Sequence, residues 1–393
     1  MFRRESERKY KNTGIPVDKM SKCSIIYLSE TVNHLKNVDF VEQQYGGIMK
    51  ERYTIRDVAA LAGVSNATVS YVLSGKKKIS EETRQRVLKV IEETGFVPDL
   101  NARGLSGKDT RLIGVVIPQT EPGSKLMFHN TFYSQLLGSI EFATRRRGYH
   151  VLISATDMTQ DYLNLIRERN LAGVIIVGTY ESRFWDRLRE LEIPVVLVDS
   201  YCKNDWFHAI RIDDEYACYC ETDYVIRKGH RRVAFASGSI KEDGVMQKRF
   251  NGYRRALTKN GIDCSDEFLF EDVVSYESGV KIAEQIVQAD IGITAVVATA
   301  DILAVGLMSG FYRLGIRVPE EISVIGFDGL EESKYTTPGL TTMQQPISRK
   351  GERAVELLLD NIGDSKMERV EEVLEVKLVE RESVRNAESV SAY

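Results

Sequence analysis

The chain has 393 residues, of which 43% are hydrophobic, a length that suits two or three domains and excludes a single small core. It has no apolar run of about 18 residues and no apolar segment after its charged first residues, so we expect no membrane span, no secretory signal and a cytoplasmic protein with five reduced cysteines. The net charge of −4 is unevenly distributed along the chain. Residues 50–108 hold eleven Lys or Arg and seven Asp or Glu, a net charge of +4, whereas residues 109–393 carry −10. A polyanionic partner is therefore expected to bind near residues 50–108.

Residues 1–49 have no helical or strand periodicity, so we expect either a disordered extension or a mis-called start. Gly46 and Gly47 stand just before Met49, and glycine codons can spell a purine-rich ribosome-binding sequence. One hypothesis is therefore that translation starts at Met49, and the alternative is a genuine flexible extension. The intact mass of the protein made by its native host distinguishes the two.

Residues 50–97 are predicted to form an all-helical domain. Three helices are expected, each with a polar residue that caps its start and a glycine that closes it: Thr54 and Gly63, Ser65 and Gly75, Ser80 and Gly95. Apolar residues at helical spacing predict a small shared core: Val58, Ala59, Val64, Val69, Val72, Leu73, Val87 and Ile91. The first two helices, joined by a tight turn at Gly63, form a helix-turn-helix pattern.

The second helix of this pattern begins with small polar side chains. A helix N-terminus carries partial positive charge, and the hydroxyl groups of Ser65, Thr68 and Ser70 can donate hydrogen bonds to phosphate oxygens. Asn66 and Tyr71 are long enough to reach base edges in a major groove. The alternative is that these residues only cap a helical hairpin.

From Arg111 onward, short apolar runs alternate with amphipathic stretches such as "YSQLLGSIEFATRRRG" and "FNGYRRALTKNG". The apolar runs, predicted to be strands, are "LIGVVIP", "HVLIS", "GVIIVG", "PVVLVD", "RVAFAS", "AVVAT" and "SVIGFD". This alternation is typical of parallel sheets covered by helices on both faces. The fold class we predict is α/β, with two doubly wound subdomains following the small all-α head.

The segment "TIRDVAALAGVSNATVSYVLSGKKKISEETRQRVLKVIEETGFVPDLNARGLSGKDTRLIGVVIP" closely resembles the head and hinge of the LacI/GalR (lac-repressor/galactose-repressor) family of bacterial transcriptional regulators. "RRVAFASG", "RVPEEISVIGFDG" and "TTMQQPISRKGERAVELLL" are similar to its effector domain, so the resemblance covers about residues 54–384. It implies a periplasmic-binding-protein-like body and a cytoplasmic homodimer without a cofactor. It also implies binding to a pseudo-palindromic double-stranded DNA operator, as a repressor whose affinity a small-molecule effector, a sugar or sugar derivative, controls.

The resemblance also implies the roles of single residues in the head and the hinge. Those expected at base edges are Asn66, Ala67 and Tyr71, and those expected at phosphates are Thr54, Ser65, Thr68, Ser70 and Lys78. In the hinge, residues 98–109, a helix is expected to enter the minor groove with Leu105 as the wedge and Ala102 and Arg103 beside it. Many members have Arg where this chain has Tyr71, so no known operator half-site can be transferred to it. The alternative for the hinge is a flexible linker.

The effector and dimerisation domain is expected over residues 110–385, with a short tail at 386–393. The subdomains predicted are an N-subdomain of 110–212 plus 335–350 and a C-subdomain of 213–334 plus 351–385. The resemblance places effector contacts at Phe132, Tyr133, Asp199, Arg249 and Asp301, where charged groups suit vicinal hydroxyls and aromatic faces suit a sugar ring. The alternatives are core packing for the two aromatic residues and an interdomain salt bridge between Arg249 and Asp301. Where the family often has an aromatic platform, this chain has Val274.

Three other functions remain as alternatives. The sequence has no P-loop, no HExxH and no GxSxG motif, so we expect no enzyme activity and no metal site. A regulator of the catabolite-control type would take a protein phosphocarrier as coeffector instead of a small molecule. A secreted sugar-transport protein would not need the DNA-binding head. The tail lacks leucine heptads, which favours a dimer over a tetramer.

Overall fold

The computed structural model of the protein describes residues 53–74, 79–96, 110–119, 130–157, 166, 169–178, 185, 188–189, 193–201, 206–363 and 368–387. The chain divides into two compact units, Met1–Ala102 and Arg103–Tyr393, which we call the head and the body. Lys78 and the expected hinge over 98–109 lie outside the described residues, as does the extension before residue 50.

The head contains three helices, α3 (Ile55–Ala62), α4 (Asn66–Ser74) and α5 (Glu81–Thr94). The predicted caps of the first helix are confirmed: Thr54 and Asp57 form a capping box, and Gly63 closes α3 in the left-handed conformation at φ 64°. Ser65 and Ser80 accept hydrogen bonds from backbone amides in the first turns of α4 and α5. Local sequence therefore sets the ends of these helices.

The three helices of the head pack around a small apolar core. Its fully buried members are Val58, Ala59, Ala62, Val69, Val72 and Val87. Val64, Leu73 and Ile91 pack against them while partly exposed, so the predicted core is confirmed. A core of this size stabilises a domain only marginally.

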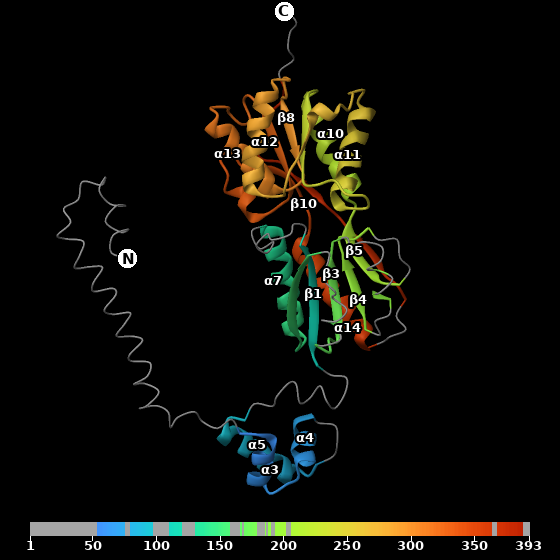
Figure 1. The fold of residues 1–393 in the computed structure, drawn as a ribbon, viewed down its shortest axis with the longest axis vertical. Helices are drawn as coiled ribbons and strands as arrows, with labels where there is room; N and C mark the ends of the chain where they lie inside the picture. Colours follow the sequence, from blue (N-terminus) through green and yellow to red (C-terminus); the bar gives the residue numbers. More distant parts are fainter. Residues whose placement is uncertain are drawn as a thin grey trace, which may run out of the picture. The chain divides into compact units, whose positions relative to one another are not determined.

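The body is built on two six-stranded sheets, drawn with their helices in Figure 1. The first has the order β11-β5-β4-β3-β1-β2 and is parallel throughout. Its strands are β1 (Leu112–Gln119), β2 (His150–Asp157), β3 (Gly173–Val177), β4 (Val195–Val198), β5 (His208–Ile212) and β11 (Glu371–Leu374). Helices α7 (Thr131–Arg146) and α14 (Ile347–Gly363) pack on one face of this sheet. We call this sheet and its helices the N-lobe.

The second sheet has the order β12-β10-β9-β8-β6-β7, in which only the pairing of β12 with β10 is antiparallel. Its strands are β6 (Val233–Ser237), β7 (Leu269–Glu271), β8 (Ala295–Ala298), β9 (Ser323–Asp328), β10 (Thr341–Gln344) and β12 (Lys377–Val379). The helices that cover its two faces are α10 (Asp214–Arg227) with α11 (Val245–Lys259), and α12 (Tyr276–Ala289) with α13 (Asp301–Arg313). These elements form the C-lobe.

The predicted α/β class with two doubly wound subdomains is confirmed, because each sheet has apolar clusters on both faces. The predicted division of the chain between the lobes is wrong near its end. The segment 335–350 does not belong to the N-lobe as a whole, since β10 extends the C-lobe sheet beside β9. Only the end of 351–385 belongs to the C-lobe, where β12 pairs with β10, because α14 packs on α7 and β11 pairs with β5 in the N-lobe. The apolar face of α14 is buried against the N-lobe, which decides its place.

Among the described residues, no helix is long and apolar enough to cross a bilayer. Cys218 and Cys220 lie on α10, the first buried and the second partly exposed.

Candidate functional site

The exposed face of α4 in the head carries the polar residues that the sequence singles out. Asn66, Ala67, Ser70 and Tyr71 are exposed, while Val69 on the same helix is buried in the core. Helical periodicity separates these two sets, because residues that face the core leave their neighbours facing outward. The structure thus brings all the predicted base-contact residues to one exposed surface.

The N-terminus of α4 is held by side-chain hydrogen bonds. The Ser65 hydroxyl oxygen accepts from the Thr68 amide at 3.1 Å and lies 2.9 Å from the Thr68 hydroxyl. At the start of α3, the Thr54 hydroxyl donates to Asp57 at 2.7 Å. Hydrogen bonds from the Thr54 backbone amide and, to a lesser extent, from its hydroxyl lower the pKa of Asp57. Two of the predicted phosphate contacts, Thr54 and Ser65, therefore also cap the two helices, and one role does not exclude the other.

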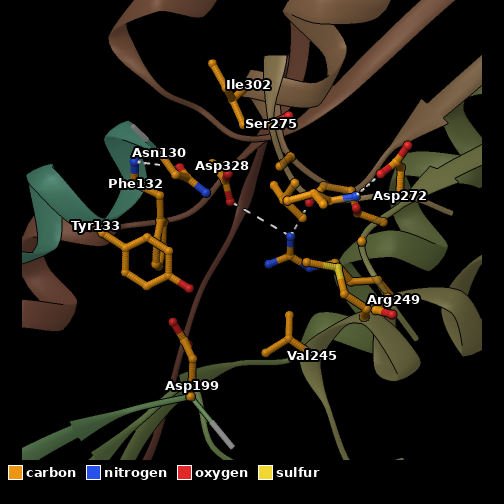
Figure 2. Close-up of a pocket in the computed structure, with 18 of the residues that line it drawn as sticks. Asn130, Phe132, Tyr133, Asp199, Val245, Arg249, Asp272, Ser275, Ile302 and Asp328 are labelled. Atoms are coloured by element: carbon orange, nitrogen blue, oxygen red, sulfur yellow. Dashed lines mark hydrogen bonds and ion pairs between the residues drawn. The ribbon is translucent and has the colours of Figure 1, made fainter. Parts of the chain in front are cut away.

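A cavity of about 930 Å³ lies in the body, among the described residues. Residues of both lobes line it, and four of the five predicted effector contacts are among them: Phe132, Tyr133, Asp199 and Arg249. Figure 2 shows Tyr133 and Asp199 on one side of this space and Arg249 on the other. A volume of this size holds a small organic molecule.

The fifth predicted contact, Asp301, does not line the cavity. It is 1% exposed and accepts hydrogen bonds from the Leu330 amide at 2.7 Å and the Thr342 hydroxyl at 2.6 Å. Burial raises its pKa well above the usual carboxyl range. Its position at the start of α13 makes it an anchor for the loop after β9. Arg249 does not pair with it, so the alternative of a salt bridge between these two residues is wrong.

A chain of polar contacts runs along the floor of the cavity from the N-lobe toward the C-lobe. Lys350 of α14 donates to both carboxylate oxygens of Asp199, at 2.6 and 2.8 Å, and to the Gln345 side chain at 2.6 Å. Gln345 in turn donates to Asp328 at 2.7 Å. Because Gln345 lies between β10 and α14, this chain crosses one of the connections between the lobes.

The contacts continue through Arg249 and return to the N-lobe. A nitrogen of Arg249 lies 3.9 Å from Asp328, the contact drawn as a dashed line in Figure 2, and its guanidinium donates to Asp214 at 2.8 Å. The other oxygen of Asp214 accepts from the Tyr201 hydroxyl at 2.7 Å. Tyr201 is two residues from Asp199 in the sequence, so the backbone joins the two ends of this set of contacts. We call this set the cleft-floor ring: Asp199, Lys350, Gln345, Asp328, Arg249, Asp214 and Tyr201.

Two carboxylates of the cleft-floor ring have unusual backbone and titration properties. Asp199 and Asp328 each follow or end a strand and have positive φ values, 53° and 117°, which non-glycine residues seldom adopt. Burial raises the pKa of Asp328 to about 6, against the opposing effect of Arg249. Burial also raises the pKa of Asp199, against the effect of Lys350. Strained, perturbed carboxylates that line a cavity are typical of ligand sites.

Five members of the ring were missed from the sequence: Tyr201, Asp214, Asp328, Gln345 and Lys350. Lys350 stands in "ISRKGERAVELLL", where neighbouring Arg and Glu residues give it the pattern of a solvated helix face, yet it is fully buried. No local signal distinguishes it. Val274 lines the cavity as expected, and the aromatic Tyr276 two residues later also lines it.

No cluster of His, Cys, Asp and Glu within the described part of the chain has the arrangement of a metal site.

The head and body match known families and structures. The family model for bacterial regulatory proteins of the lacI family matches residues 54–99, and that for a periplasmic binding protein-like domain matches residues 222–384. The HTH-type transcriptional repressor PurR of Vibrio atlanticus is 33% identical over 341 residues, 84% of this chain and 98% of that protein. Catabolite control protein A of Priestia megaterium is 34% identical over 310 residues, 78% of this chain and 91% of that protein.

Among solved structures, the lac repressor dimer bound to operator and the anti-inducer ONPF is 25% identical, with a TM-score of 0.73 over 85% of this chain and 100% of the other. The transcriptional regulator CelR in complex with cellobiose is 26% identical, with a TM-score of 0.61 over 84% of this chain and 100% of the other. A helix-turn-helix head on a two-lobed ligand-binding body defines a DNA-binding transcriptional regulator with an effector domain. The chain belongs to the lacI family of such regulators.

Proposed function

We propose that this protein is a homodimeric, cytoplasmic repressor whose affinity for a pseudo-palindromic operator is set by a small polyhydroxyl effector bound in the cavity of the body. The observation that carries the proposal is that one chain combines an exposed polar α4 face in the head with a cavity lined by both lobes. The similarity to repressors, and to a regulator crystallised with cellobiose, supports it.

In this proposal α4 enters the major groove of the operator. Asn66 hydrogen-bonds a base edge, Tyr71 gives one hydroxyl contact and a ring that packs on a thymine methyl, and Ala67 makes an apolar contact. The groups that hold phosphates are Thr54, Ser65, Thr68, Ser70 and Lys78. These contacts orient the head, and the three base contacts select the sequence.

The hinge couples the head to the body. Leu105 enters the minor groove between base pairs, with Ala102 allowing close approach and Arg103 contacting the groove. Unstacking a base step costs a few kcal/mol, which the contacts to bent DNA offset. Leu105→Ala should therefore weaken specific binding far more than non-specific binding, and equal losses on both DNAs would contradict the wedge.

The effector acts by shifting the population of lobe arrangements. A ligand that contacts Phe132 and Tyr133 of the N-lobe and Arg249 of the C-lobe stabilises one relative lobe position. It can change DNA affinity only by its differential affinity for the two states, typically about 1–3 kcal/mol. No enzymatic step is required of the cavity.

Footprinting of the purified chain on DNA upstream of its own neighbouring genes, with and without candidate sugars, tests the proposal. We expect protection of a dyad-symmetric site and a change in protection with one class of ligand. Absence of any preference for a dyad-symmetric duplex at moderate ionic strength would overturn it. A protein coeffector is not favoured, because a PurR repressor and catabolite control protein A match the chain about equally well.

A further inference from the structure

The cavity of the body has an excess of negative charge among its described lining residues. Five carboxylates and two cations line it: Asp199, Glu271, Asp272, Glu277, Asp328, Lys241 and Arg249. A cleft walled by one sign of charge concentrates ligands of the opposite sign and repels those of the same sign. Whether this excess governs binding depends on how far the nearby cations are already paired.

Arg249, the cation deep in the cavity, has its charge paired with a buried carboxylate and three of its five N–H donors bonded within the protein. Its Nε and one Nη lie 2.8 Å from the same oxygen of Asp214, and its other Nη donates to the Thr299 carbonyl at 2.5 Å. Its guanidinium carbon lies 3.6 Å from the centroid of the Phe327 ring. An incoming phosphate or carboxylate would compete with Asp214 for a positive charge that is already paired, and drawing Arg249 away would leave Asp214 buried without its cation.

Lys350 beneath the cavity is engaged in the same way. Its ammonium group has three donors, and the three contacts to Asp199 and Gln345 use them all. The cleft-floor ring therefore contains three carboxylates and two cations, and both cations are committed to the protein itself. Neither buried cation is available to neutralise an anionic ligand.

The rim of the cavity adds to the negative charge. Lys281 lies 2.6 Å from Asp272. Lys241 also lines the cavity, but the carboxylates at the rim outnumber the lysines. Glu271 accepts a hydrogen bond from the Ile240 amide, which satisfies the carboxylate without neutralising it. Together with exposed Glu277, these groups leave the entrance acidic.

Uncharged binding groups are present at the same cavity. The hydroxyl of Thr299 is buried without a hydrogen-bond partner although Thr299 lines the cavity, and Phe132 and Tyr133 supply aromatic surface. Hydroxyl groups and aromatic faces suit a polyhydroxyl ring.

We infer that the cavity selects polyhydroxyl ligands that are uncharged or carry an amino group, and excludes their phosphorylated or carboxylated counterparts. This inference rests on the proposed function, because it names the effector class of the same cavity. An anion entering the cavity meets repulsion from Asp199 and Asp328, and each buried cation nearby is already paired with a carboxylate. An ammonium group on the ligand is attracted by the same carboxylates.

The local potential can be measured without knowing the effector. Val245 lines the cavity at the start of α11 and is labelled in Figure 2, so Val245→Cys places a small thiol there. A cationic and an anionic methanethiosulfonate reagent are reacted with this thiol in the full chain, and the two rates are expressed as a ratio. The ratio cancels the intrinsic reactivity of the thiol. The exposed native Cys264, beyond the other end of α11, is the reference in a chain with native Val245. Cys23, Cys202 and Cys220 are replaced by serine in both chains, and Cys264 is also replaced in the Val245→Cys chain, so that each chain carries one of the two thiols compared.

We expect the cation-to-anion rate ratio at position 245 to exceed that at Cys264 by about tenfold or more at low salt, and to fall toward it as salt screens the rim. Glu277→Gln at the rim should lower the ratio, whereas Glu320→Gln, an exposed carboxylate that does not line the cavity, should not. A ratio equal to or below the reference overturns the inference. Such a ratio would overturn only the ligand class, because operator binding would still be observed. Failed footprinting would instead overturn the proposed function and would not change the rate ratio.

A ligand comparison provides a second readout. For any sugar skeleton that raises the unfolding temperature of the full chain, its amino derivative should stabilise at least as well and its phosphate ester less. A phosphate ester that stabilises the protein more than its uncharged parent contradicts the inference.

Discussion

The head and the cleft-floor ring use polar residues in opposite ways. In the head, Asn66, Ser70 and Tyr71 are exposed on one helix, and neighbours in the sequence are neighbours in space. In the ring, Asp199 and Lys350 are 151 residues apart in the sequence, and both are buried. An exposed polar face is available to a partner such as DNA, whereas buried polar groups must form their hydrogen bonds and ion pairs with one another. The difference predicts that substitutions in the ring change stability, while those on the head surface change recognition.

The largest effect is expected from Arg249→Met. The substitution leaves Asp214 buried without its cation, so it should lower the free energy of unfolding of the body by about 3–5 kcal/mol. Chemical denaturation monitored separately for the head and the body measures it. The control is Arg255→Met, since Arg255 pairs with Glu215 on the surface, where loss of an ion pair costs about 1 kcal/mol or less. Equal losses in the two variants would remove the distinction between ring and surface.

The two regions should also respond oppositely to pH. The pKa of Asp328 is raised from 3.8 to about 6, so its contribution is present at low pH and is lost as pH rises through about 6. The pKa of Asp57 in the head is lowered, so its contribution is present above the unfolded pKa and lost as pH falls. Burial, which raises this pKa, outweighs the charged groups around Asp328, of which Arg249 and Lys350 lower the pKa and Asp214 raises it.

Asp328→Asn tests this contrast. Between pH 4 and pH 7 the wild-type body should lose of order 1–3 kcal/mol relative to the variant, measured by urea unfolding at each pH. The head should show the same pH profile in both proteins. A variant whose body keeps the wild-type slope would show that Asp328 does not titrate in this range.

A smaller effect, confined to recognition, is expected from Asn66→Ala. It should weaken binding to the footprinted operator by about 1–3 kcal/mol, because one base contact is lost, and leave binding to a scrambled duplex unchanged at the same salt concentration. Gln85→Ala on exposed α5 is the matched control, expected to affect neither duplex. If Asn66→Ala weakens both duplexes equally, the residue contacts the backbone rather than a base.

The smallest effect separates the two roles of the hydroxyls on α4. Ser65→Ala removes the hydrogen bond to the Thr68 amide and should cost the head about 1 kcal/mol, measured by its thermal unfolding. Ser70→Ala, within the helix and exposed, should reduce DNA affinity without lowering head stability. Equal stability of the two variants would mean that the Ser65 cap is unimportant.

The strands of the body differ in how clearly the sequence predicts them, and several lack a clear pattern. The run "SVIGFD" was predicted and forms β9, whose residues are all buried. The strand β11, "EEVL", was missed because it pairs only with β5 at the edge of the sheet and alternates exposed and half-buried residues. The antiparallel β12 has three residues, too few to show a period. Central β3, β4 and β8 are apolar and buried along their whole length, whereas β11 and β12 at the sheet edges carry little signal.

The sequence by itself determined the helix ends in the head, the α/β alternation of the body and four of the residues that line the cavity. These features depend on caps, periodicity and strand ends, which involve residues close together in the chain. Only the tertiary structure decided that α14 belongs to the N-lobe, that Asp301 anchors a loop away from the cavity and that Lys350 lies beneath it. Burial of a charged side chain depends on partners brought from distant segments, so a local pattern cannot distinguish a buried lysine from a solvated one.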